Sequence, residues 1–317
     1  MHFAEQTGLL LVIASATLWA TVGVATQLVP GALDLSPELY GFARTAIAGP
    51  VLLLLAWFAG RGRTLPLARM WRKEIAVIAL SSVVFQLCLF RSFAEVGVTV
   101  TVFLTVCLQP VLAVIWTLMV RQATVNAAAC TALGLALAGL ASFAIGPGAG
   151  LPAMRMDAAA LFFPVFASVA FVVMSYAARS LAESATPLQV AGAGLTLSSL
   201  LLLPALPWLL PSSGGFATPL VLADGQVLLL LLYLGLGPTA LAYFCYCAGM
   251  ARCKSAISGL IATMVEPVVA AALAMAVLHE RLTSGELAGC MLLMLAMAVL
   301  WHGERPKVTM PLAEPAE

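Results

Sequence analysis

The chain has 317 residues, of which 62% are hydrophobic and only 9% are charged, and its formal net charge is +1. Its mean hydropathy is +1.06. So few polar side chains cannot cover a globule of this size in water, and the composition therefore indicates an integral membrane protein. A net charge so close to zero gives no reason to expect nucleic acid as a partner.

Charged residues divide the sequence into apolar stretches of about 20 residues, the length that crosses a bilayer as a helix. We therefore expect an all-α protein with ten transmembrane helices, over residues 8–29, 38–60, 74–93, 98–120, 124–145, 158–179, 187–210, 225–249, 255–278 and 283–302. The seventh helix is separated from the eighth by the proline- and glycine-rich run "LPALPWLLPSSGG".

Lysine and arginine set the expected orientation, because cytoplasmic loops carry an excess of both. With a cytoplasmic N-terminus, only Arg155 and Arg281 fall in outer loops. The inner loops and the C-terminal tail then hold Arg61, Arg63, Arg69, Arg72, Lys73, Arg121, Arg179, Arg252, Lys254, Arg305 and Lys307. Both termini are expected in the cytoplasm.

The second half of the chain repeats the first at an offset of 157 residues. "LTVCLQPVLAVIWTLMV" aligns with "IATMVEPVVAAALAMAV", which places Gln109 on Glu266 and Pro110 on Pro267. We expect one five-helix repeat in residues 1–150, a second in residues 151–303, and a short cytoplasmic tail in residues 304–317. Because five is odd, the second repeat is inverted relative to the first, an arrangement typical of secondary transporters that work by alternating access.

Each repeat carries a polar residue followed by proline near the bilayer midplane. Because proline has no N–H to donate, we expect helix breaks at Pro110 and Pro267 that free the carbonyls of Val106 and Thr263. A carboxylate such as that of Glu266 costs free energy at this depth in the membrane. We therefore expect Glu266 and its counterpart Gln109 to bind substrate. The alternative is a kink that serves only helix packing.

The same offset pairs Gln86 with Tyr243. Tyr243 and Tyr246 share one helical face, as do Gln86 and Phe90. Aromatic rings with polar tips suit a cavity for a small organic solute, and Trp19 lies near the middle of the first span instead of at an interface. We expect these five residues to bind substrate, with plain helix packing as the alternative.

A carboxylate at the depth of Glu266 can exchange a proton for a cationic or amine-bearing substrate, so protons are a possible second partner. Arg44 lies six residues inside the second span, and the sequence alone does not identify its charge partner.

Catalysis is not expected, because an intramembrane hydrolase needs a paired nucleophile and base, or metal ligands, at depth. The three histidines lie at the ends of spans, and the seven cysteines have no ligand spacing. We expect no enzyme activity, no metal and no cofactor. A pore or a structural membrane protein remains the alternative of another class.

The stretch "LLYLGLGPTALAYFCYCAGMARCKSAISGLIATMVEPVVAAALAMAVLHERLTSGELAGCMLLML" resembles the second EamA module of the drug/metabolite transporter superfamily. The first half is similar through "LWAT", the position of Arg44 and "LQPVLAVIW". It departs from the module at Arg121 and at Gln109, where the module usually has acidic residues.

The resemblance implies a ten-helix carrier, often an exporter of amino acids or related metabolites across a bacterial inner membrane. Import or exchange of another small metabolite, or of an organic cation, is the alternative within this class. We expect the protein to be a monomer.

Overall fold

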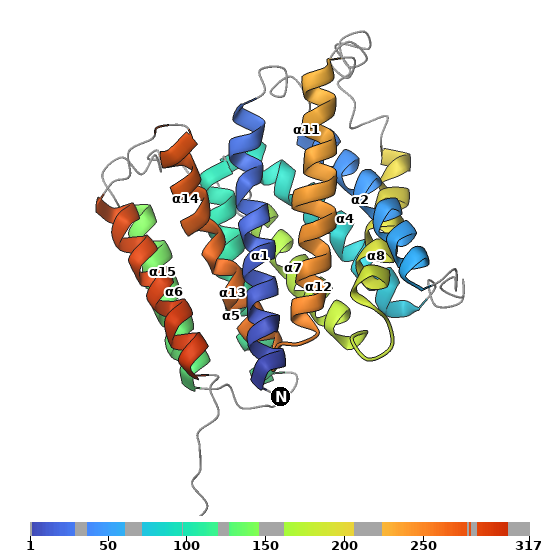
Figure 1. Cartoon of the computed structure of the whole chain (residues 1–317). Coiled ribbons are helices and arrows are strands. Elements are labelled where there is room, and N and C mark those ends of the chain that lie inside the picture. The colour runs from blue at the N-terminus through green and yellow to red at the C-terminus, as the bar shows by residue number, and fades with distance from the viewer. Residues whose placement is uncertain are drawn as a thin grey trace, which may run out of the picture.

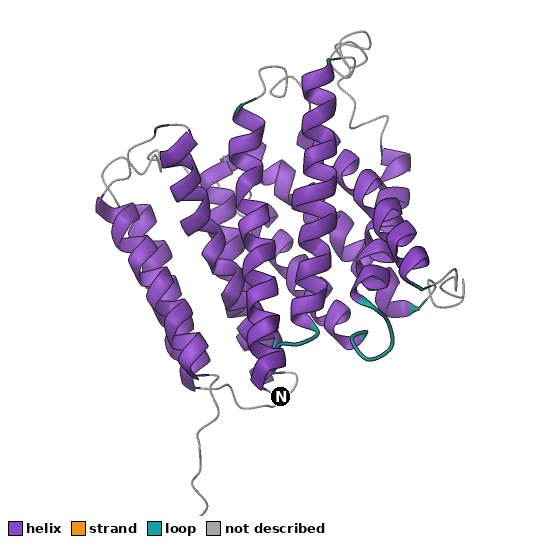
Figure 2. Cartoon of the chain, in the orientation of Figure 1, coloured by secondary structure: helices purple, strands orange, loops and turns teal. Residues whose placement is uncertain are grey.

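The computed structural model describes residues 2–28, 37–60, 72–96, 98–119, 127–145, 162–205, 224–277, 279 and 284–303. These residues form helices joined by turns, and no strand occurs among them (Figure 2). The expected tail at residues 304–317 lies outside the described part of the chain.

The first half of the chain forms five helices: α1 (His2–Gln27), α2 (Pro37–Ala59), α4 (Lys73–Val96), α5 (Val98–Met119) and α6 (Ala127–Ile145). The second half also forms five rods. Three are simple: α7 (Phe162–Ser180), α8 (Pro187–Leu202) with the short turn η2 (Leu203–Ala205), and α15 (Ser284–Gly303). Two are composite: α11 (Gly225–Gly235), η3 (Leu236–Leu241) and α12 (Ala242–Met250), then α13 (Ala256–Ala262), η4 (Thr263–Val265) and α14 (Glu266–Val277). The predicted all-α fold with ten helices is therefore confirmed.

Local sequence signals explain where several of these helices begin. Thr186 caps α8 in a capping box with Gln189, and the Asp224 side chain accepts a hydrogen bond from the N–H of Gln226 at the start of α11. Ser255 caps α13 by accepting from the N–H of Ser258. Each side chain satisfies a backbone donor that has no partner within its helix.

Five of the helices are long and apolar enough to cross a membrane: Glu5–Val22, Leu39–Ala59, Phe162–Ser180, Gly225–Met250 and Ala256–Val277. Shorter apolar helices lie within α5, α6, α8 and α15. Many large apolar side chains are exposed on these helices, for example Leu229 and Met291 at 68% and 67%. Such a surface is stable against lipid, and the chain is an integral membrane protein.

The helix contacts show an approximate two-fold symmetry between the two halves. The pair α2–α8 and the pair α6–α15 each join equivalent helices of the two repeats (Figure 1). The contact of α4 with α7 is matched by that of α12 with α1, and the contact of α5 with α7 is matched by that of α14 with α1. Each of these helix contacts therefore has a counterpart in which the two repeats have changed places.

The two equivalent prolines differ in their surroundings. Before Pro267 the helix tightens into the 3₁₀ turn η4, and the N–H of Glu266 donates to the carbonyl of Thr263. The expected free carbonyl of Thr263 is therefore already bonded, because a 3₁₀ bond replaces the bond that proline cannot make. The expected break at Pro110 is wrong: α5 runs through this buried proline as one helix. A helix can absorb one missing bond as a bend without ending.

Candidate functional site

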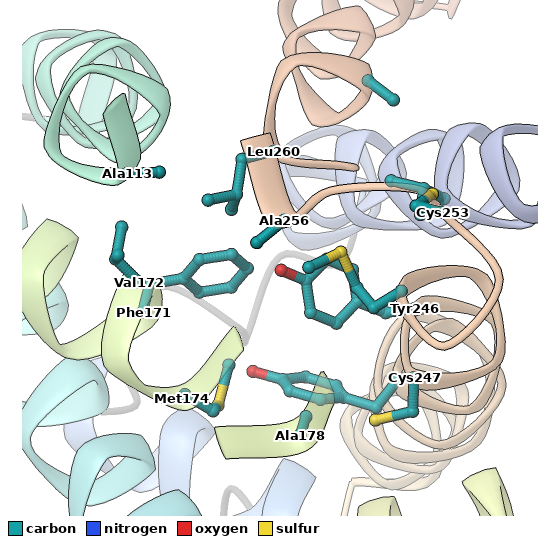
Figure 3. Close-up of a cluster of buried hydrophobic side chains, with 14 of the residues drawn as sticks. Ala113, Phe171, Val172, Met174, Ala178, Tyr246, Cys247, Cys253, Ala256 and Leu260 are labelled. Atoms are coloured by element: carbon teal, nitrogen blue, oxygen red, sulfur yellow. The ribbon is translucent and has the colours of Figure 1, made fainter. Parts of the chain in front are cut away.

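Four aromatic side chains meet in the middle of the bundle and form what we call the aromatic cluster: Trp19, Phe171, Tyr243 and Tyr246. The ring centre of Trp19 lies 5.8 Å from Phe171, 5.6 Å from Tyr243 and 5.4 Å from Tyr246. Phe171 and Tyr246 face each other at 5.4 Å (Figure 3). The cluster joins α1 to α7 and α12, and thus one repeat to the other.

A hydrogen bond fixes the innermost ring of the cluster. The hydroxyl of Tyr246 lies 2.6 Å from Oγ of Ser175 on α7, and either oxygen can donate. Only 1% of Tyr246 is exposed, and Ser175 is fully buried. A buried hydroxyl that keeps its partner holds the ring in one orientation, so this wall of the cluster is preorganised.

Arg44 on α2 is held by a residue of the second repeat. Its Nε donates to Oγ1 of Thr239 at 2.9 Å, and the Thr239 hydroxyl donates to the carbonyl of Leu234 at 2.7 Å. That carbonyl lies four residues before Pro238, which has no N–H to offer it. The threonine hydroxyl therefore replaces the missing helix bond, and the chain widens into the π-helical η3 at this point.

The charge partner of Arg44, which the sequence did not identify, lies close by. Arg44 is within electrostatic range of Tyr243 on α12 and of Glu266 at the start of α14. Among the described side chains no direct ion pair joins Arg44 to Glu266. The two groups belong to different repeats, and both lie within electrostatic range of Tyr243 in the aromatic cluster.

The structure brings Trp19, Tyr243 and Tyr246 together and places Glu266 near Tyr243. Gln86 on α4 and Gln109 on α5 are 3% and 5% exposed, and Gln86 Oε1 has no hydrogen-bond partner. Within the described part of the chain, neither glutamine hydrogen-bonds to the aromatic cluster. The side chain of Phe90 lies outside the described residues.

Next to the cluster lies a small cavity between α4, α7, α8 and α12. Its walls include Ser82, Met174, Tyr243, Tyr246 and Cys247. The centre of a water molecule can occupy about 10 Å³ of this cavity. This is room for about one water molecule. A metabolite therefore needs helix movement before it can enter from this side.

The sequence did not identify four residues of the site as ones that bind substrate or position its ligands: Arg44, Thr239, Phe171 and Ser175. For Arg44 the signal was present, since a charge inside a transmembrane span is a functional candidate by default. The proline of "LGPTAL" next to Thr239 was a second signal, because π-helical turns often occur at functional sites. Phe171 and Ser175 have no comparable signal, because apolar and small hydroxyl residues occur all along such helices.

The site combines the guanidinium of Arg44, the carboxyl group of Glu266 and the four rings of the aromatic cluster. A guanidinium binds a carboxylate through two parallel N–H donors, and a carboxylate or an aromatic face attracts an ammonium group. No group of three or more possible metal ligands occurs among the described residues.

Comparison with known proteins gives the family. The model of the EamA-like transporter family matches residues 6–145 and again residues 155–302. One solved structure, described only as a crystal structure of a protein, has 19% sequence identity and a TM-score of 0.73 over 93% of this chain and 96% of its own. No curated protein matches the sequence significantly. The family model covers most of both halves, and the chain therefore belongs to the EamA-like transporter family.

Proposed function

We propose that the protein is a secondary carrier that exports amino acids or related small metabolites by alternating access. The observation that carries this proposal is the position of Arg44 and Glu266, a guanidinium and a carboxyl group on different repeats that both lie within electrostatic range of Tyr243 in the aromatic cluster. An amino acid carries both matching charges on one small molecule. Its carboxylate fits the guanidinium of Arg44, and its ammonium group fits Glu266.

The aromatic cluster supplies the remaining surface of the proposed site. Trp19 and Tyr243 lie in edge contact beside the charges, and aromatic rings bind both apolar side chains and ammonium groups. This favours amino acids with apolar or aromatic side chains over strongly polar ones. An organic cation without a carboxylate leaves Arg44 unpaired, which is costly away from water.

The packing of the helices supports transport by alternating access. The matched contacts of the two repeats mean that the bundle can exchange the conformations of its halves, so that one central site opens to either face in turn. Glu266 gives a route for coupling, because a carboxylate can take up a proton when the ammonium group leaves. This makes proton antiport the coupling mode that we propose.

Lysine and arginine placement supports an orientation with both termini in the cytoplasm, and we propose a bacterial inner membrane as the location. Export follows from coupling to an inward proton gradient, since the cycle itself is reversible. Import or exchange would require another driving gradient.

Counterflow in liposomes tests the proposal. Purified protein is reconstituted into vesicles loaded with one unlabelled amino acid, and uptake of the labelled form is followed for apolar, aromatic, acidic and basic amino acids. Matching amines and carboxylic acids serve as controls. We expect saturable counterflow with apolar or aromatic amino acids and little with the amine or the acid alone. Counterflow by amines alone would indicate an organic-cation carrier, and non-saturable flux would indicate a pore.

A further inference from the structure

At the end of the bundle where α1 begins, an ion pair joins α1 to the turn between α12 and α13. Nζ of Lys254 lies 2.5 Å from Oε2 of Glu5. The side chain of Glu5 is only 5% exposed, whereas that of Lys254 is 60% exposed. Oε1 of Glu5 is buried without a hydrogen-bond partner. Lys254 therefore partly covers a carboxylate that would otherwise be buried without a countercharge.

Arg179, in the last turn of α7, binds the same turn from the other side. Its Nη1 donates to the carbonyl of Met250 at 2.6 Å and to that of Cys253, and its Nη2 donates to the carbonyl of Lys254 at 2.8 Å. The last carbonyls of a helix lack partners within it, so a guanidinium is well suited to bind them. These bonds tie α7 to the end of α12.

Two glycines allow α1 and α12 to touch at this end. A Cβ atom added to Gly249 would lie 2.7 Å from the carbonyl oxygen of Gly8, and one added to Gly8 would lie 2.9 Å from Cβ of Arg252. Neither position has room for a side chain without movement of a helix. We use the name latch for Glu5, Gly8, Arg179, Gly249 and Lys254, which together close this end of the bundle.

The charged residues of the latch have no charged equivalents in the other repeat. Moving each latch residue by the repeat offset of 157 gives positions that carry no charge: Phe162 for Glu5, Val165 for Gly8, Val22 for Arg179, Ser92 for Gly249 and Gly97 for Lys254. Two equal halves would give the two end-closed states similar free energies. The equivalent positions cannot form the same ion pair or guanidinium bonds, although the hydroxyl of Ser92 lies 2.7 Å from that of Thr101. The charged contacts of the latch therefore favour the state in which the latch end is closed.

We propose that the latch sets the resting state of the carrier, closed on the face where α1 begins, and that its opening is the step that admits solutes from that face. This inference depends on alternating access as proposed above, but not on the identity of the substrate. With a cytoplasmic N-terminus, the latch is the cytoplasmic gate.

Cys253 offers a native probe of the latch, since it lies within the turn and is 2% exposed. A protein that keeps Cys253 alone is placed in nanodiscs, where both faces are accessible, and its alkylation rate is measured. We expect Glu5→Gln to raise this rate about two- to five-fold, the range for loss of one partly exposed ion pair. Gly249→Ala is expected to raise it as well, without any change of charge.

Two matched variants serve as controls. Arg72→Gln removes a charge from the Arg72–Glu74 pair, 3.3 Å long, at the start of α4. Gly134→Ala adds a Cβ that meets nothing within 4 Å. Thermal unfolding checks that every variant is folded. An unchanged rate in both Glu5→Gln and Gly249→Ala would overturn the latch, as would an equal rise in Arg72→Gln. Because no substrate is added, neither outcome depends on whether amino acids are transported.

Discussion

Thr239 is the residue on which the geometry of the charged site depends. Its hydroxyl accepts from Nε of Arg44 and donates to the carbonyl of Leu234, so one side chain both positions a guanidinium and repairs the helix beside Pro238. With Nε occupied, the terminal nitrogens of Arg44 remain for a carboxylate. Thr239 is thus a positioning residue and need not touch the substrate.

We expect Thr239→Val to raise the KM for counterflow about ten- to hundred-fold with protein abundance little changed, since a hydrogen bond to a charged group contributes about 1.5–3 kcal/mol. Thr239→Ser keeps the hydroxyl and is expected to behave like the natural protein. Equal KM values for Thr239→Val and Thr239→Ser would show that the hydroxyl does not position Arg44.

Glu266→Gln tests the coupling role of this partly buried carboxyl group. Glutamine keeps the size and the hydrogen-bonding capacity of glutamate but cannot release a proton. We expect a variant that inserts normally, loses transport driven by a pH gradient and keeps some counterflow. The measurement is uptake into vesicles with and without a pH gradient. A pH dependence like that of the natural protein would leave Glu266 with a structural role beside Pro267.

The sequence predicted the aromatic half of the site better than its charged half. Trp19, Tyr243 and Tyr246 are rare residue types at mid-span, so composition alone made them candidates. Arg44 was noticed for its depth, but its partner Thr239 lies 195 residues away in the chain. Such a contact depends on how two repeats pack, and no local pattern encodes it.

At the scale of helices, α2 and α8, which are equivalent helices of the two repeats, pack closely through two glycines. A Cβ added to Gly49 would lie 2.5 Å from the backbone nitrogen of Thr196, and one added to Gly192 would lie 2.8 Å from that of Leu53. Small residues let helices approach closely in a membrane, where packing contributes much of the association energy.

Gly49→Ala is therefore expected to destabilise the bundle by about 1–3 kcal/mol, because the backbone opposite cannot move aside as a flexible side chain would. Thermal unfolding in detergent measures the loss, with Gly225→Ala as the matched control because nothing lies within 4 Å of its added Cβ. A Gly49→Ala protein as stable as its parent would mean that the two helices can separate at little cost.

Helix positions followed from composition because the bilayer sets their length, and the expected spans match the observed helices to within a few residues at most ends. The start of the first helix differs by six residues, because α1 begins at His2 and includes Glu5 and Gln6, which the hydropathy of the sequence placed outside the span. The two prolines show the limit of such reasoning. Pro110 and Pro267 occupy equivalent positions, yet one lies within a continuous helix and the other follows a 3₁₀ turn.

At the scale of the whole molecule, the two repeats have matching contacts but different chemistry. The offset of 157 residues aligns Glu266 with Gln109 and Arg44 with Leu201, so neither charged residue of the proposed site has a charged counterpart in the other repeat. The latch lies at one end of the bundle. In the proposed transport cycle, the matching packing allows reversible movement between two states, and the differences in charge would select the substrate and the resting state.

Two-sided access to the site is the central claim, and Cys247 is placed to test it. This residue is 9% exposed and lines the cavity together with Tyr243 and Tyr246. A protein that keeps Cys247 alone is labelled with a small, membrane-impermeant thiol reagent in right-side-out and in inside-out vesicles. The account predicts that the reagent reacts from both faces and that saturating amino acid slows the reaction from both. Reaction from one face only, or reaction that no transported amino acid slows, would contradict it.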